Sequence, residues 1–93
     1  MKRRPYTIIV AKRVREKTEA FFETHEELIP CFLQLMQEIR LTPYEGVGRP
    51  HRLTRELRYS NCWSRCLDRE HRLVYNVIDS VRNVFIVYVG EHY

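Results

Sequence analysis

The chain opens with a short apolar run and then changes its hydrophobic period. Residues 6–10 read Tyr-Thr-Ile-Ile-Val, a β-branched run that predicts an opening strand. From Lys12 onward, apolar side chains recur at helical spacing between charged ones, on a face that holds Val14, Thr18, Phe21 and Phe22. The pattern predicts a first helix whose phenylalanines belong to the core.

A second helix is predicted before Thr42, and its start has two interpretations. Thr24 and Glu27 have the spacing of a capping box, in which two side chains satisfy free backbone donors. Pro30 would clash deep inside a helix, so the helix can instead begin with Pro30 in its first turn. Both interpretations leave one apolar stripe, formed by Phe32, Leu35, Met36 and Ile39. We expect the helix to end before Thr42 and Pro43, because the residue preceding a proline avoids helical geometry.

Three strand-like runs dominate the second half of the chain. They follow a glycine-rich connector at 43–50 and lie at 62–67, 71–78 and 84–89. Short strands joined by tight turns form an antiparallel meander. In the middle run, alternation puts Leu73, Tyr75 and Val77 on one face of the sheet and Arg72 on the other.

These elements predict an α+β fold in which two N-terminal helices pack on a twisted antiparallel sheet of four to five strands. The 93 residues are expected to make one domain, 1–93, around a single core. No apolar run reaches the length of a membrane helix, and Lys12 and Arg13 break the first run too early for a signal peptide. We therefore expect a cytoplasmic protein without membrane contact.

The charge distribution suits a polyanionic partner. The net charge is +4, thirteen of the sixteen basic residues are arginine, and seven arginines fall between Arg49 and Arg72. Arginine's planar fork pairs two-pronged with phosphate oxygens, although a solvated basic face is the other interpretation. Four arginines recur at every third position: Arg49, Arg52, Arg55 and Arg58. A helix or tight turn would collect them on one side, and we predict that they bind RNA.

The chain also holds the side chains that metal-free RNA cleavage requires. Such a reaction needs a base for the 2′-hydroxyl, a cation for the charged transition state and an acid for the leaving 5′-oxygen. Histidine suits either proton role because its unperturbed pKa is about 6.5, arginine suits the second role, and tyrosine can stack on a base or bind a phosphate. The candidates are His51, His92, Arg65, Arg72 and Tyr93.

No metal or other cofactor is expected. Carboxylates are sparse where the arginines cluster, and no paired-aspartate motif is present. Cys62, Cys66 and His71 match no standard zinc spacing, and the three cysteines, an odd number, are expected to be reduced thiols. We expect His71 to order a turn and Trp63 to lie in the core.

Four motifs resemble one family. They are T-P-Y-E-G-V-G-R-P at 42–50, W-S-R at 63–65, E-H-R-L-V-Y at 70–75 and the closing H-Y, and in order and spacing they are similar to the Txe/YoeB branch of the RelE/ParE toxin superfamily. The resemblance implies a RelE-like fold and a bacterial toxin of a type II toxin–antitoxin pair. It implies an endoribonuclease, or mRNA interferase, that cuts mRNA in the ribosomal decoding site and leaves a cyclic phosphate and a 5′-hydroxyl. The implied partners are the ribosome, a YefM/Phd-type antitoxin, operator DNA only through that antitoxin, and a second copy in a homodimer.

The resemblance also assigns roles to single residues. Arg72 falls on the family's phosphate-steadying arginine, and His92 falls on its general acid. Tyr93 falls on the final tyrosine and Arg65 on the arginine after W-S. The chain departs from the family at the general base, where His51 replaces a glutamate. It departs at two basic positions as well, which here hold Cys66 and Thr54.

The departure at His51 has three interpretations: His51 is itself the base, Glu45 serves instead, or the site is weakened. We favour the first as a hypothesis. Two other functions are alternatives, namely a non-catalytic gyrase inhibitor like the ParE branch and an attenuated toxin that acts mainly as an antitoxin-bound co-repressor. The closing H-Y and E-H-R-L-V-Y argue against the gyrase inhibitor, because these motifs track with the mRNA-cleaving branch.

Overall fold

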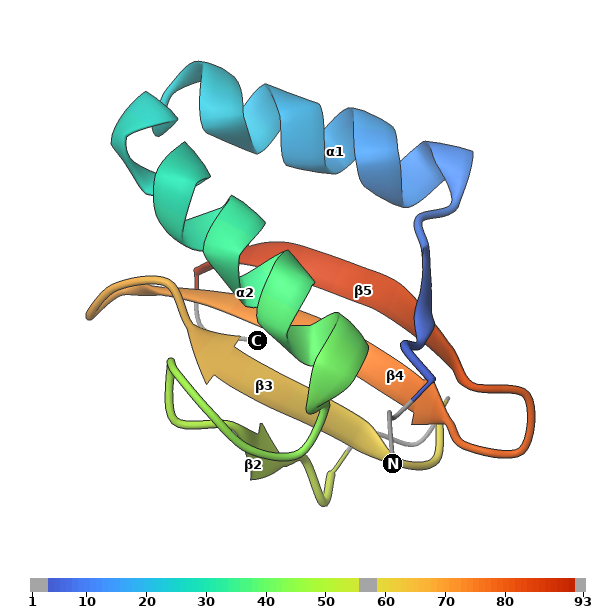
Figure 1. Ribbon diagram of the computed structural model, residues 1–93. Coiled ribbons are helices and arrows are strands. Elements are labelled where there is room, and N and C mark those ends of the chain that lie inside the picture. The colour runs from blue at the N-terminus through green and yellow to red at the C-terminus, as the bar shows by residue number, and fades with distance from the viewer. Residues whose placement is uncertain (1–3, 56–58, 92–93) are drawn as a thin grey trace.

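The computed structural model describes residues 4–55 and 59–91, and this part of the chain forms two α-helices and five strands (Figure 1). In chain order the elements are β1 (Thr7–Ile9), α1 (Lys12–Glu23), a short 3-10 turn (Glu26–Leu28), α2 (Ile29–Leu41), β2 (His51–Arg52), β3 (Cys62–Cys66), β4 (His71–Ile78) and β5 (Asn83–Glu91). The predicted strands and helices are therefore confirmed, and β2 is added to them. Neither described helix is long and apolar enough to cross a membrane.

The strands form one sheet in the order β1-β5-β4-β3-β2. The strands β2 to β5 make the predicted antiparallel meander. β1 pairs parallel with β5, with Thr7 opposite Asn83, so the sheet is mixed rather than antiparallel throughout. Hydrophobic period identifies a strand but not its neighbour, and for that reason the sequence pattern missed this pairing.

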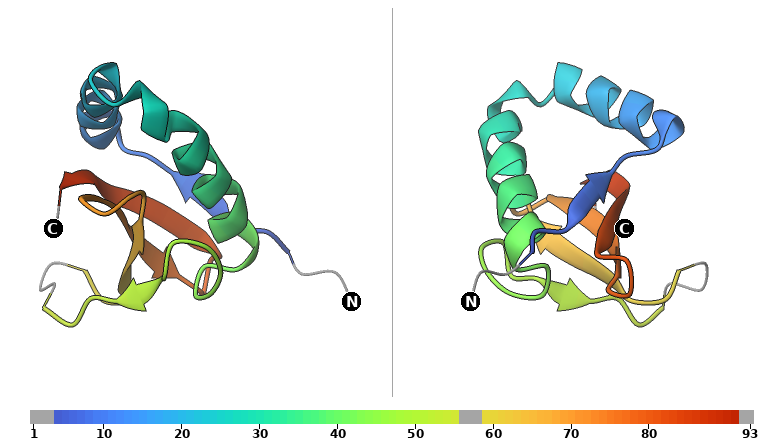
Figure 2. Two further views of the ribbon diagram at one scale, coloured as in Figure 1. Left: turned by 90° about the vertical axis from the view of Figure 1, so that its left-hand side faces the viewer. Right: turned by 45° about the vertical axis from the view of Figure 1, so that its right-hand side comes forward.

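The two helices contribute to one core on one side of the sheet. α2 crosses that face, and α1 lies beyond it along β5 (Figures 1 and 2). The predicted inner face of β4 is confirmed, since Leu73, Tyr75 and Val77 are buried together with Leu35 and Ile39 of α2. The opposite face of the sheet carries the other half of each strand, and we call it the open face because neither described helix covers it, although Ser64 and Val74 on this face are buried. Its residues include His51, Ser64, Cys66, Arg72, Val74 and Tyr88.

The start of α2 follows the proline interpretation. Pro30 lies in the first turn of the helix, where its missing N–H costs no hydrogen bond. The capping box is not formed, because the Thr24 hydroxyl donates to the carbonyl of Phe21 at 3.2 Å and no side chain caps the helix. α2 ends at Leu41, one residue before Thr42, as the proline that follows predicts.

Candidate active site on the open face

Strand register brings two of the predicted site residues onto the open face. His51 on β2 lies opposite Ser64 on β3, which lies opposite Val74 on β4, and Val74 lies opposite Tyr88 on β5. The next row on this face runs from Cys66 through Arg72 to Gly90. His51 and Arg72 therefore flank β3 on the same side of the sheet, with Cα atoms roughly 12 Å apart by ideal strand spacing.

Arg72 is half-buried beside a thiol. Its Nη1 atom donates to the Sγ atom of Cys66 at 3.1 Å. On the other side, Gly90 has no side chain, and a Cβ atom there would lie 2.7 Å from the hydroxyl of Tyr88. The ring of Tyr88 thus covers Gly90, and a side chain at this position of β5 would collide with that ring.

Three of the four arginines spaced three apart are described, and these three do not lie on one helix. Arg52 pairs with Trp63 in β2, and Arg49 adopts a left-handed backbone conformation at φ 52° just before that strand. Arg49, Arg52 and Arg55 are all exposed, and in the described part of the chain no helix collects them on one side. A strand turns successive side chains to opposite faces, so His51 and Arg52 diverge. Arg58 lies outside the described residues.

Arg65 occupies a position that does not fit its predicted catalytic role. Its side chain is fully buried on the helix side of the sheet. The guanidinium donates to five protein acceptors: the hydroxyl of Tyr75, the carboxylate of Glu38 and the carbonyls of Thr42, Glu45 and Val47. A substrate on the open face cannot reach these donors, and we infer that Arg65 positions the chain rather than contacting RNA.

The object that Arg65 positions is the connector between α2 and β2. Glu38 also holds the connector, because its Oε1 atom accepts a hydrogen bond from the backbone amide of Val47 at 2.5 Å. Gly48 follows at φ 88°, and its carbonyl accepts from the amide of Cys66 at 2.6 Å. The connector is therefore held against β3, and it delivers His51 to the sheet edge. Sequence reasoning missed Glu38 in this role, since a lone glutamate on a helix carries no signal of its buried partner.

A second polar cluster holds the other end of the connector. The hydroxyls of Tyr6 and Tyr44 each donate to the Asp79 carboxylate at 2.5 Å. These hydrogen bonds, with the one from Tyr44 the stronger influence, hold the pKa of Asp79 below its ordinary value. Burial, and after it the Asp79 hydrogen bond, raises the pKa of Tyr44 to about 12.

His71 orders the turn between β3 and β4, as predicted. It is buried, and its Nδ1 atom lies 2.9 Å from the carboxylate of Asp68. Burial works to raise the pKa of Asp68, but hydrogen bonds from Glu70 and His71 outweigh it and lower that pKa. Trp63 packs against the core, also as predicted.

Two predicted catalytic residues, His92 and Tyr93, lie outside the described residues. β5 ends at Glu91, which pairs with His71 at the end of the sheet that carries the Arg72 row. Within residues 4–55 and 59–91, no group of three or more His, Cys, Asp or Glu side chains could hold a metal ion.

Comparison with known proteins identifies a family. The model of the family described as the YoeB-like toxin of bacterial type II toxin–antitoxin systems matches residues 12–93. Toxin YoeB of Escherichia coli strain K12 is 38% identical over 71 residues, which cover 76% of this chain and 80% of that toxin.

Solved structures agree with the sequence comparisons. The YoeB dimer from Staphylococcus aureus superposes with a TM-score of 0.77 at 28% identity, over 96% of this chain and 99% of that one. The YoeB-YefM complex from the same organism gives a TM-score of 0.73 at 26% identity, over 95% and 98% of the two chains. The RelE-RelB complex from Pyrococcus horikoshii, at 15% identity and a TM-score of 0.69 over 94% of each chain, shares the fold.

Proposed function

The chain belongs to the YoeB-like toxin family of bacterial type II toxin–antitoxin systems, and we propose that it is a ribosome-dependent endoribonuclease that inhibits translation by cutting mRNA. The observation that carries the proposal is the placement of His51 and Arg72 on one face of the sheet, on either side of β3. A base and a cation that share a face can act on one phosphodiester.

In the proposed reaction His51 takes the proton from the 2′-hydroxyl, and the 2′-oxygen attacks the adjacent phosphorus. Arg72 stabilises the extra negative charge on the phosphate oxygens in the transition state. The bond to the 5′-oxygen breaks as His92 donates a proton to that oxygen, which leaves a 2′,3′-cyclic phosphate and a 5′-hydroxyl. Tyr93 assists at the phosphate or stacks on a base. The reaction needs no metal or other cofactor.

The exposed arginines beside β2 extend the RNA contact. Arg49 and Arg52 flank His51 in the chain, and Arg55 follows in the next loop. With Arg58 they would neutralise phosphates of mRNA or of ribosomal RNA on either side of the scissile bond. Arg65 supports this surface from beneath through the connector.

The proposed partners follow the relatives. A Staphylococcus aureus YoeB binds YefM and a YoeB from that organism forms a dimer, so we propose a YefM/Phd-type antitoxin and a homodimer for this chain. Operator DNA is then bound only through the antitoxin. Residues 1–93 would form a single domain that acts in the cytoplasm, where its ribosomal target lies.

The test compares induced variants in cells that lack the antitoxin. The parent should arrest growth, and primer extension should reveal new mRNA 5′ ends. His51→Ala, Arg72→Gln and His92→Ala should each lower the rate of cleavage on purified ribosomes by at least about 100-fold. Arg69→Gln, which removes an exposed turn arginine, is the matched control and should cut as the parent does.

Two results would overturn the proposal. Growth arrest with intact transcripts would indicate a gyrase-type inhibitor, and absence of arrest would indicate an attenuated toxin that serves as a co-repressor. Full activity in His51→Ala would remove His51 as the base.

A further inference from the structure

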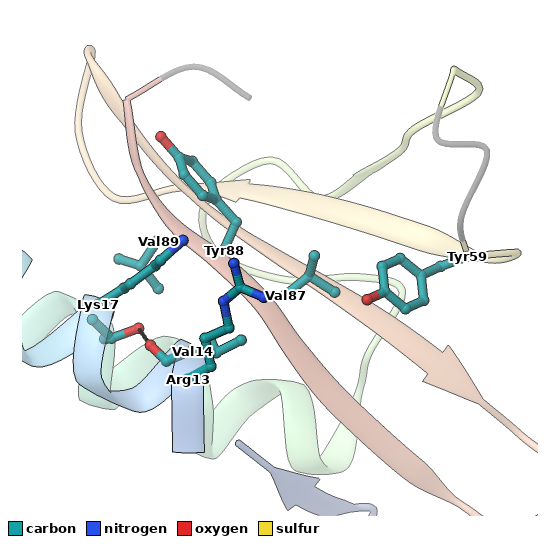
Figure 3. A pocket seen from close by; sticks show the side chains of 8 residues that line it. Arg13, Val14, Lys17, Tyr59, Val87, Tyr88 and Val89 are labelled. Carbon is teal, nitrogen blue, oxygen red and sulfur yellow. Dashed lines mark hydrogen bonds between the residues drawn. The ribbon is translucent and has the colours of Figure 1, made fainter. Parts of the chain in front are cut away.

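A pocket of about 320 Å³ opens between α1 and β5 (Figure 3). Its walls are Arg13, Val14, Lys17 and Thr18 of α1, Val87, Tyr88 and Val89 of β5, and Tyr59 of the loop before β3. β1 pairs with β5 only as far as Phe85, so the outer edge of β5 along the pocket has no strand beside it among the described residues.

The pocket adjoins the candidate active site. Tyr88 lies in the register row that contains Val74, Ser64 and His51, and its ring covers Gly90 beside Arg72. Tyr88 therefore lies between Arg72 and the pocket, and a chain bound at Arg72 would pass Tyr88 to enter it.

Two cations line this pocket, and no acidic residue is among the described residues that line it. Arg13 and Lys17 are one helical turn apart, and both side chains reach from α1 toward β5 (Figure 3). Neither has an ion pair with any residue in the described part of the chain, whereas Arg15, on the same helix, pairs with Glu19 at 3.8 Å. Like charges at this spacing repel, so an anion bound between them would be favoured.

The remaining walls suit a nucleobase. Tyr59 and Tyr88 present phenol rings, and Val87 and Val89 supply apolar surface. Phenol rings stack on bases of any sequence, and cations beside them neutralise the adjoining phosphate. An RNA nucleotide, which joins an aromatic base to a phosphate, combines these two requirements.

We propose that this pocket is a nucleotide subsite, in which Arg13 and Lys17 bind one phosphate of single-stranded RNA and Tyr59 and Tyr88 contact the adjoining base. The inference rests on the proposed function, because it places an RNA nucleotide next to the proposed cleavage site.

The test measures binding of a fluorescein-labelled single-stranded RNA decamer to the free toxin by fluorescence anisotropy. The pocket variant is Arg13→Gln with Lys17→Gln. The matched control is Lys12→Gln with Arg15→Gln, which removes two other positive charges, one lysine and one arginine, from the same helix. At low salt the dissociation constant should rise about tenfold in the pocket variant and less than about threefold in the control. The slope of log K against log salt should shrink by about 0.7 for each lost phosphate contact in the pocket variant.

A third variant, Tyr59→Leu, tests the base contact. Leucine keeps apolar volume but has no ring, so RNA binding should weaken about fivefold with little change in the salt slope. All these side chains lie at the surface of the pocket, and circular dichroism would verify that each variant folds.

Equal losses in the pocket variant and its control would overturn the subsite, since general electrostatics would then suffice. Unchanged RNA binding with weakened antitoxin binding would also overturn it and would assign the pocket to an acidic segment of the antitoxin. If RNA binding differs between the pocket variant and its control as expected, but the parent cuts no mRNA on ribosomes, the proposed function would be contradicted and the subsite would not.

Discussion

The guanidinium of Arg65 lies 2.9 Å from the carboxylate of Glu38, across the interface between β3 and α2. Arg65 is fully buried, and the side chain of Glu38 is only 25% exposed. A buried charge pair is not strong evidence for stability in itself, but removing one partner leaves the other charge and its neighbours unsatisfied. The pair therefore fixes the connector that carries His51 to the sheet.

Arg65→Lys should destabilise the protein although the charge is retained. Lysine cannot supply the planar fork that serves five acceptors, and the free energy of unfolding should fall by about 3 kcal/mol in urea. The control is Arg15→Lys, whose exposed pair with Glu19 should matter by less than about 0.5 kcal/mol. Parental stability combined with loss of cleavage would instead support a catalytic role for Arg65.

Gly48→Ala should weaken the attachment of the connector to β3. The glycine adopts φ 88°, and an added Cβ atom would lie 2.9 Å from the carbonyl oxygen of Cys66. Strain and the clash together should lower the free energy of unfolding by about 2 kcal/mol, measured by thermal melting.

Glu45→Ala in the same connector is the control for Gly48→Ala. Only the backbone carbonyl of Glu45 bonds to Arg65, and its side chain is exposed. Stability and mRNA cleavage should both stay at the parental level. A large loss of mRNA cleavage in Glu45→Ala would instead support Glu45 as the general base.

Ser64→Ala should be neutral or stabilising. Ser64 is fully buried, and within the described structure its hydroxyl has no hydrogen-bond partner. An unsatisfied buried hydroxyl carries a desolvation penalty, so its removal should raise the free energy of unfolding by up to about 1 kcal/mol. The matched control is Thr18→Val, because the Thr18 hydroxyl donates to the carbonyl of Val14 at 2.8 Å and its loss should cost about 1 kcal/mol. A loss in Ser64→Ala as large as that in the control would contradict this.

Asp79 should make stability depend on acid. Its pKa is lowered by the hydrogen bond from Tyr44 and, to a lesser extent, by the one from Tyr6. The resulting stabilisation is present above the ordinary carboxyl pKa of about 4 and is lost as the pH falls through the lowered value. The urea concentration at the unfolding midpoint of the parent should therefore decrease when the pH is lowered below about 4. Tyr44→Phe removes the stronger of the two hydrogen bonds and should flatten that drop.

Tyr44 should have a matching effect in base. Its pKa is raised to about 12. The resulting stabilisation is present below the ordinary tyrosine pKa of about 10 and is lost as the pH rises toward the raised value. Ultraviolet titration of the phenolates in Tyr44→Phe should show one fewer group ionising near that pH. An unchanged titration curve would contradict the assignment.

Cys66→Arg should raise activity and lower stability. The new cation would lie beside Arg72, where it adds charge next to the transferring phosphate, and cleavage on ribosomes should quicken about tenfold, or about 1.4 kcal/mol in the barrier. Without RNA the two guanidinium groups repel each other, so the melting temperature should fall. Cys66→Ser is the control and should change neither property strongly.

The elements of this fold could be predicted from local sequence. The β-branched run before Lys12, the helical spacing of Phe21 and Phe22, and the alternation along β4 depend only on neighbours in the chain. The motifs that resemble the YoeB branch are local as well, and the family they indicated is the one that the comparisons show.

The roles within the site required the folded chain. The motif W-S-R suggested that Arg65 meets RNA, yet its partners are Glu38, 27 positions earlier, and the connector carbonyls, which no local pattern pairs with it. The parallel pairing of β1 with β5 and the shared face of His51 and Arg72 likewise depend on contacts between distant segments. Local sequence specifies period and turn chemistry through short-range sterics, whereas burial and hydrogen-bond partners are set only when the sheet and helices pack together.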